Sequence, residues 1–470
     1  MGRSSLYRRV HLPLVLSAII IVLISYLRFI ATGTLALDMA FPSHLTAEII
    51  GILFVGSVFL AAYGYWNASM HGTEWGMTLE KTIFLSKMLG VISFFSLPLL
   101  SNDIFIYLSC GQAPLLGIHP YTEPSALFHT VYHSYVPSIW ADGPYCKYGP
   151  AAISLAHFAA LIGGKSPFWG IFAWKVLVLA AFLLFCDAIG LLIRHFRSEE
   201  GNVAPFILLC PILWEQGPGQ GHNDIFAVLF LTAALLLLAY QRYLLSILLL
   251  VLGLQVKFYI LPLVALFFLA WWRTVGRTYR QIGHFCGGIV SAGLFMALLH
   301  YPYWDGWNTL TAIYGPLVAE DPMNNVSYLV PYGVVTLFPS LASLRSFFEM
   351  GIRVVLICGA GIISLWQIYR LIRGKDRMYL VFLRIMAFVV CFTSLRFHGW
   401  YLMVLLPLCA EGIPKAWLRW GTVVFPATLF FDLHNFLPRD SFVLLAFLPL
   451  AVVGVNVLFF VNLRERLTAH

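Results

Sequence analysis

An aspartate lies at the end of an apolar stretch, in the sequence "LLSNDIFIYLSCG" of residues 99–111. The apolar run 82–100 leads into Ser101-Asn102-Asp103, and aromatic sequence resumes at once. Asp103 can cap a helix that begins here, because a carboxylate accepts hydrogen bonds from the free N–H groups of a helix start. It can also serve as a general base that takes a proton from an attacking hydroxyl. We predict that Asp103 is catalytic.

Cationic and imidazole side chains occur near the ends of two other apolar stretches. Lys257 lies in "LGLQVKFYI", and Arg396 and His398 lie in "LRFHGWY". Polar groups at membrane depth are costly and mark functional paths. These three are predicted to bind a phosphate and to stabilise it as a leaving group. The alternatives are a lysine that reaches the membrane interface and a loop that joins two spans. A histidine such as His398 is expected to respond to pH near neutrality.

Aromatic and amide side chains near these positions are candidates for sugar contacts. The rings of Trp400, Tyr401 and Tyr148 are flat faces of the kind that stack on sugars. His222-Asn223-Asp224 can contact donor or acceptor, or can cap the helix that starts there, with Asp224 as the cap. Six residues are assigned to sugar or acceptor binding: Asn102, Tyr148, His222, Asn223, Trp400 and Tyr401.

The elements that position these residues are apolar segments. The chain has 470 residues, of which 60% are hydrophobic and 11% charged, with a mean hydropathy of +0.84. Soluble domains carry about 25% charged residues. The apolar stretches lie near 11–30, 47–66, 82–100, 168–193, 203–216, 222–240, 243–256, 258–272, 282–300, 350–372, 378–393, 399–412, 417–432 and 442–462. We predict an all-α polytopic membrane protein of about 12–14 transmembrane helices, which form a single domain over residues 1–470.

The basic residues indicate how this bundle is oriented. They cluster in short connections, whereas the two long loops, 102–149 and 301–349, carry only Lys147 and Arg345 between them. By the positive-inside rule the long loops face outward and both termini are cytoplasmic. This orientation requires that residues 151–164 do not fully cross. The predicted location is the plasma (inner) membrane of a bacterium, and the scattered basic residues form no nucleic-acid-binding stripe.

The two long external loops are rich in aromatic residues and proline, which is atypical of disordered segments. We expect short helices there that lie at the membrane interface and cover a cavity between spans. Cys110 and Cys146 in the first loop can pair if it faces an oxidising compartment, although two free thiols are the simpler interpretation. Asp142 is interpreted as a turn residue. No cofactor is predicted, and a divalent metal is not favoured because carboxylates and histidines do not cluster.

A carboxylate beside a cationic and aromatic pocket at the outer face suits transfer of a sugar from a lipid phosphate to a hydroxyl. The segments that carry this pattern also resemble a family. "LLSNDIFIYLSCGQAPLLGIHPY" and "VPSIWADGPYCKYGP" are followed in order by "GHNDIFAVLFLTAALLL", "LGLQVKFYILPLVALFFL" and "RFHGWYLMVLLPL". This order resembles the polyprenyl-phosphate-mannose-dependent α-mannosyltransferases of the GT-C glycosyltransferase superfamily.

The resemblance implies a GT-C-type bundle, a polyprenyl-phosphate sugar donor and a glycolipid or polysaccharide acceptor outside the cytoplasm. Mannose is the favoured sugar. A single displacement at the anomeric carbon would invert its configuration, and one base, Asp103, suffices because phosphate is already a good leaving group. Two alternatives remain. A lipid-linked sugar transporter or flippase would carry gates on both faces, and a GT-C enzyme could use a different lipid-phosphate sugar.

Overall fold

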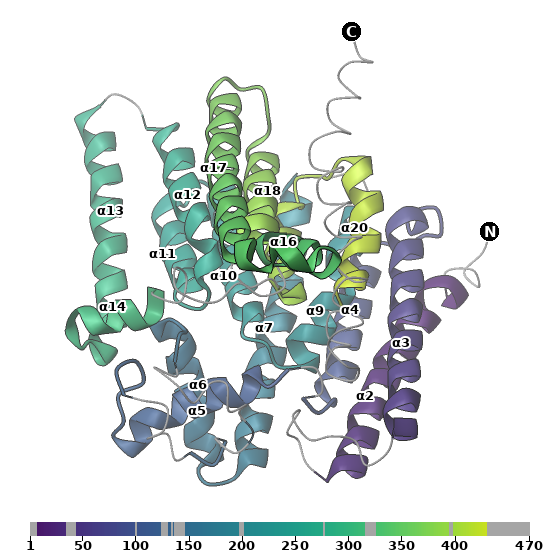
Figure 1. The fold of residues 1–470 in the computed structure, drawn as a ribbon. Coiled ribbons are helices and arrows are strands. Elements are labelled where there is room, and N and C mark those ends of the chain that lie inside the picture. The colour runs from purple at the N-terminus through teal and green to yellow at the C-terminus, as the bar shows by residue number, and fades with distance from the viewer. Residues whose placement is uncertain are drawn as a thin grey trace.

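The computed structural model describes residues 7–33, 44–98, 101–123, 130–132, 135, 146–196, 202–275, 278–314, 326–393 and 398–429. Within these ranges every regular element is a helix (Figure 1). Asp142, Arg396 and the apolar stretch predicted at 442–462 lie outside the described residues.

Five helical segments of the described part are long and apolar enough to cross a membrane: Arg8–Thr32, Glu48–His71, Pro167–Phe196, Tyr279–Tyr303 and Pro339–Ile372. They contain α2 (Leu12–Thr32), α3 (His44–His71), α7 (Pro167–Phe196), α13 (Tyr279–His300) and α17 (Arg345–Ile372). Apolar side chains of α13 remain exposed, with Leu294 and Leu298 at 67% and 66%. An outer surface of this kind suits contact with lipid, and the fold is an all-α polytopic membrane protein, as predicted.

Several predicted spans are shorter helices in the structure. They include α10 (Asp224–Ala239), α11 (Tyr243–Leu254), α12 (Leu261–Trp272) and α18 (Met378–Phe388). The segment predicted not to cross forms α6 (Pro150–Gly163), whose 14 residues extend only about 21 Å at 1.5 Å per residue. That length is less than the ~30 Å of a bilayer core. The expected total of 12–14 spans therefore stays a prediction.

Helix packing brings the polar segments of the sequence together. α10 packs against both α7 and α11, and α4 (Leu79–Phe94) packs against α7, where Gly90 lies directly on the ring of Phe182. α5 (Asp103–Gln112) packs on α6, which in turn packs on α7. These contacts place the starts of α5 and α10 beside the end of α11, so that residues far apart in the chain surround one volume.

The two ends of the bundle differ in their chemistry. The basic α12–α13 and α17–α18 connections lie at the upper end in Figure 1, whereas α5, α6 and α14 (Gly306–Tyr314) lie at the lower end. At the upper end Asp376 forms ion pairs with both Arg370 and Arg384. The second long loop contains α14 and α16 (Val326–Leu337), so both long loops include short helices, as expected.

Candidate active site

Asp103 is the first residue of α5, and its carboxylate does not cap this helix. Asn102 is at the cap position without a side-chain cap bond, and the Ser101 hydroxyl accepts the Asp103 N–H at 3.1 Å. The Asp103 Oδ2 accepts instead from the Tyr107 hydroxyl at 3.1 Å. The Asp103 side chain is 23% exposed. A carboxylate that is held by its own helix, yet still accessible, is suited to proton transfer.

His222 completes a compact group with Asp103 and Tyr107. Its Nδ1 lies 3.4 Å from the Tyr107 hydroxyl and 3.6 Å from the Asp103 Oδ2, and the imidazole is buried. Gly221, immediately before it, has a φ of +77°, a backbone conformation that glycine adopts without strain. The chain can therefore turn sharply between the π-helix η6 (Glu215–Gly219) and α10, which directs His222 towards Asp103.

Two neighbouring residues of α7 hold the loop that carries His222. Trp174 Nε1 donates to the carbonyl oxygen of Gly221 at 2.7 Å. The buried Lys175 Nζ donates to the carbonyl oxygen of Gly219 at 2.8 Å and also to that of Ser96. Because both side chains bind backbone, they fix the position of the loop. Neither residue stands out in the sequence.

Lys257 is paired with a carboxylate from the start of α10. Its Nζ lies 3.1 Å from Asp224 Oδ2, and the Tyr259 hydroxyl donates to Asp224 Oδ1 at 2.6 Å. Asp224 is the first residue of α10, and the cap residue Asn223 makes no side-chain cap bond. The expectation that Asp224 caps this helix is wrong, because its carboxylate binds these two side chains. The pocket predicted to be cationic thus contains a balancing negative charge.

Aromatic rings connect the Lys257 pair to the Asp103 group. Lys257 Nζ lies 5.2 Å from the ring centre of Tyr148 and 5.6 Å from that of Tyr401. The edge of Tyr148 contacts Tyr107 at a centroid distance of 4.8 Å. A cation over an aromatic face is attracted by its quadrupole. The ring of Tyr148 therefore lies between the lysine and the tyrosine that binds Asp103.

Trp400 joins two imidazoles to this assembly. Its ring stacks on His222 at a centroid distance of 4.0 Å and on His398 at 4.3 Å. The side chain of Trp400 is only 5% exposed. Its role in sugar binding stays a prediction, and the stacking gives it a second role as support for His222.

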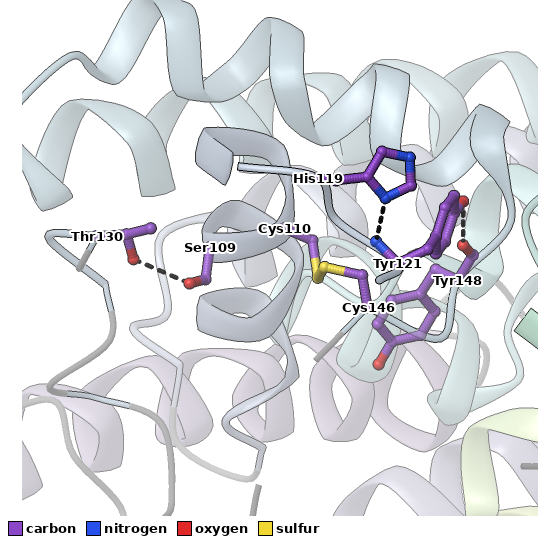
Figure 2. Close-up of a disulfide and its surroundings, with 7 residues drawn as sticks. All are labelled: Ser109, Cys110, His119, Tyr121, Thr130, Cys146 and Tyr148. Carbon is purple, nitrogen blue, oxygen red and sulfur yellow. Dashed lines mark hydrogen bonds between the residues drawn. A yellow bond between two sulfur atoms is a disulfide. The ribbon is translucent and has the colours of Figure 1, made fainter. Parts of the chain in front are cut away.

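A disulfide and a close backbone contact fix Tyr148. Cys110 of α5 is bonded to Cys146, so the interpretation of two free thiols is wrong. Figure 2 shows this disulfide beside the hydrogen bond from the Tyr121 hydroxyl to the carbonyl oxygen of Tyr148, which is 2.7 Å long. Gly149 lies so close to the carbonyl of Gln255 that any Cβ would overlap it. The first loop is therefore attached both to α5 and to the segment that carries Lys257.

The surroundings of these groups change their proton affinities. Burial tends to raise the pKa of Asp103, but His222, Lys257 and His398 together outweigh it, and the pKa lies below its usual value. Burial lowers the pKa of His222 to about 4, although Asp103 and Asp224 act in the opposite direction. Burial likewise lowers the pKa of His398 to about 3. The expectation that a histidine here titrates near neutrality is therefore wrong, because the surrounding protein disfavours the charged form of its ring.

Most of the predicted site residues meet in one place, and Arg396 lies outside the described residues. Those brought together are Asp103, Tyr148, His222, Lys257, His398, Trp400 and Tyr401. Asn102 and Asn223 flank them, each with a buried amide oxygen that has no hydrogen-bond partner among the described residues.

Four further residues were missed: Tyr107, Tyr259, Trp174 and Lys175. Only Tyr107 carried a signal in the sequence, since it follows Asp103 by four positions and so shares its helix face. Within the described residues, no group of three or more histidine, cysteine or acidic side chains is placed to hold a metal ion. That a divalent metal is not favoured stays a prediction.

The fold and the site together define a polytopic helical membrane protein with an accessible carboxylate beside buried polar and aromatic groups. The family described as "Alpha-(1->6)-mannopyranosyltransferase, N-terminal domain" matches residues 18–274, which is more than half of the chain. The protein belongs to this family, and the resemblance to GT-C mannosyltransferases is confirmed.

Individual relatives carry the same description. Alpha-(1->6)-mannopyranosyltransferase A of Mycobacterium tuberculosis is 27% identical over 256 residues, which cover 52% of this chain and 47% of that protein. Alpha-(1->6)-mannopyranosyltransferase B of Corynebacterium glutamicum is 32% identical over 141 residues, 29% of this chain and 23% of the relative. The A protein of that organism is 22% identical over 370 residues, 72% of each chain. The alignments thus span about half of the first relative and a quarter of the second. No solved structure matches the chain.

Proposed function

We propose that this protein is a membrane glycosyltransferase that moves a mannosyl residue from a polyprenyl-phosphate donor to a hydroxyl of a glycolipid or glycan acceptor. The proposal places the reaction on the extracytoplasmic side of a bacterial plasma membrane, with both termini in the cytoplasm. Membership of the family supports the reaction class, and the relatives' description supports mannose. The observation that carries the proposal is the accessible, hydrogen-bonded carboxylate of Asp103 beside the Lys257 pair.

The reaction is a single displacement. Asp103 takes the proton of the acceptor hydroxyl while its oxygen attacks the anomeric carbon. The bond from that carbon to the phosphate oxygen breaks, and polyprenyl phosphate leaves with the electron pair. A β-linked donor then gives an α-linked product. Since Asp103 Oδ2 is held by Tyr107, we assign the proton transfer to Oδ1.

The donor phosphate is assigned to Lys257, together with Arg396. Charge builds on the leaving phosphate in the transition state, and a positioned ammonium stabilises it. Because Asp224 already balances Lys257, the ammonium is pre-oriented at 3.1 Å from that carboxylate. His398 acts here as a neutral hydrogen-bond donor, since burial keeps its pKa near 3. Asn102, Tyr148, His222, Asn223, Trp400 and Tyr401 are assigned to sugar and acceptor contacts.

The first prediction concerns the base. Asp103→Asn keeps the shape of the side chain and its contact with Tyr107 but cannot take a proton, so we expect transfer to fall by about 10³-fold or more. Purified variant is offered a polyprenyl-phosphate mannose donor, and product is measured after extraction. Donor binding, measured separately, should be unchanged because Asp103 does not bind the phosphate.

Asp187→Asn is the matched control. Asp187 is an exposed aspartate on α7 that pairs with Lys87. It lies about 20 Å along the helix from Trp174, and its variant should retain wild-type transfer. Wild-type turnover by Asp103→Asn would remove Asp103 from the mechanism. Movement of intact lipid-linked sugar across the membrane without transfer would instead identify a transporter.

A further inference from the structure

A cavity with several polar residues in its lining is found at the end of the bundle opposite Asp103. It has a volume of about 400 Å³ and lies between the ends of α7, α10 and α12 and the start of α18. Its polar lining comprises His195, Gln241, Arg273, Thr274 and Glu411. α10 has 16 residues, so this cavity is about 24 Å from the Asp224–Lys257 pair at the other end of that helix. It takes no part in the proposed transfer.

The lining of this cavity offers charges of both signs. Arg273 contributes a guanidinium, a group that binds phosphate oxygens through paired N–H donors. Glu411 contributes a carboxylate, whose Oε2 accepts the Tyr379 N–H at 3.3 Å. Arg377 lies beside Glu411 but donates to its backbone carbonyl oxygen, at 3.1 Å. A ligand that carries both a phosphate and a cation matches this pair.

Gln241 adds a neutral hydrogen-bonding group to the cavity lining. It is the single non-glycine residue of the described part with a positive φ, +58°, in the turn between α10 and α11. Glycine or asparagine normally takes this position after a helix. The positive φ closes α10 in a Schellman motif, in which the Arg242 N–H donates to the Leu237 carbonyl oxygen at 2.8 Å and the Gln241 N–H to that of Leu238 at 2.9 Å. Here the glutamine places an amide, both donor and acceptor, in the cavity lining.

Exposed aromatic rings place the cavity at the level of lipid head groups. Tyr240 and Trp272 are 54% and 49% exposed, and each is next in sequence to a lining residue. The ring of Tyr240 contacts that of His195 at a centroid distance of 4.9 Å. Tyrosine and tryptophan are enriched at the membrane–water interface. A head group is therefore the ligand that can enter from the side without leaving the bilayer.

We propose that this cavity binds the head group of a phospholipid that carries a phosphodiester and a primary amine. The phosphate binds Arg273 with help from Gln241, and the ammonium binds Glu411. Basic pockets between helices commonly take lipid head groups. Because the lining offers one guanidinium and one carboxylate, it favours a zwitterionic head group over an anionic one. A primary ammonium is also favoured over a quaternary one, because its N–H groups can donate hydrogen bonds to Glu411.

The test uses the purified full chain and short-chain lipids. Dihexanoyl phosphatidylethanolamine, phosphatidylcholine and phosphatidylglycerol are titrated by calorimetry. We expect one equivalent of the ethanolamine lipid to bind at least tenfold more tightly than the other two. Arg273→Gln should weaken its binding at least tenfold, and Glu411→Gln should abolish the preference for it over phosphatidylglycerol.

Two variants of the same turn separate binding from folding. Gln241→Gly relieves the strained φ, so it should unfold at the same or a higher temperature and yet bind the ethanolamine lipid several-fold more weakly. Arg242→Gln removes an exposed charge next to the cavity but not in its lining, and should bind like wild type. Equal weakening by Arg242→Gln and Arg273→Gln would overturn the site, because a diffuse surface charge would explain both. Equal affinity for soluble glycerophosphoethanolamine would overturn the lipid assignment.

Discussion

The proton affinity of Asp103 depends on residues from three other segments of the chain. His222, Lys257 and His398 each favour its charged form, while burial opposes it. Tyr107 donates to the same carboxylate from one turn further along α5. A base needs a lone pair at the working pH and must also release its proton afterwards. The lowered pKa keeps Asp103 ionised near neutral pH, as the proposed role of base requires.

The pH dependence of the rate tests this environment. The ionised form is active, so the rate rises with pH through the pKa of Asp103 and is constant above it. Since that pKa lies below its usual value, kcat should be flat from pH 5 to pH 7.5. Lys257→Met removes one favourable charge and should move the acidic limb to higher pH. An acidic limb near pH 6.5 in wild type, or no shift in the variant, would contradict this assignment.

At the scale of the helices, hydrogen bonds from α7 hold the loop before α10 and so position His222. Trp174 and Lys175 bind the carbonyl oxygens of Gly221 and Gly219, on either side of the turn. Trp174→Phe keeps an aromatic ring but removes the indole N–H, and loss of that hydrogen bond costs about 1 kcal/mol; the smaller ring also leaves space at this buried position. We expect kcat/KM to fall about tenfold, with a lower kcat and a higher KM for the acceptor, because His222 shifts relative to Asp103 and to the sugar or acceptor assigned to it. Trp169→Phe is the control, because the Trp169 side chain is 54% exposed on α7, and it should leave kcat and KM unchanged.

The contact between Gly149 and Gln255 joins the first loop to α11. A methyl group at position 149 would overlap backbone atoms of Gln255, which cannot move as a side chain tip does. Gly149→Ala should therefore separate Tyr148 from Lys257, reduce activity at least tenfold and destabilise the protein by about 1–3 kcal/mol. Gly51→Ala is the control, since no atom lies within 4 Å of its added methyl group. Transfer activity and unfolding temperature are measured for both variants. Equal effects of the two substitutions would show that the Gly149–Gln255 contact has no special role.

The sequence predicted uninterrupted helices well and broken ones poorly. Length and apolar content located α2, α3 and α7 to within a few residues. The stretch predicted as a span at 203–216 is instead divided into α8 (Val203–Leu208), α9 (Pro211–Trp214) and the start of η6. Pro211 lacks an N–H and disfavours helical backbone in the residue before it, and Cys210 has ψ of 121°. Hydropathy alone does not register such a break.

The sequence identified the charged residues of the site, but it did not identify the residues that pair with them. Asp103 and Lys257 stood out because charges are rare in an apolar chain. Their partners did not, because Tyr107 and Asp224 become neighbours of these charges only through helix starts that pack together. An aspartate at a helix start can cap the helix or form an ion pair, and only the positions of α10 and α11 decide between the two.

At the scale of the whole molecule, the two ends of the bundle differ in their chemistry. The disulfide Cys110–Cys146 lies at the end that holds Asp103, and disulfides persist in oxidising compartments. The basic connections lie at the other end, as expected for a cytoplasmic face (Figure 1). These two observations are independent of each other, and both favour an extracytoplasmic site.

Accessibility of single cysteines in intact cells tests this orientation. Leu116→Cys and Lys375→Cys place thiols at exposed positions on the two ends, in a background where the exposed free cysteines Cys286 and Cys358 are serine. A membrane-impermeant maleimide should label position 116 from outside, because it follows α5 on the side of Asp103. Position 375, in the basic α17–α18 connection, should react only after the membrane is permeabilised. The reverse pattern would place Asp103 in the cytoplasm, where the disulfide would be reduced and a donor on the outer leaflet would be out of reach.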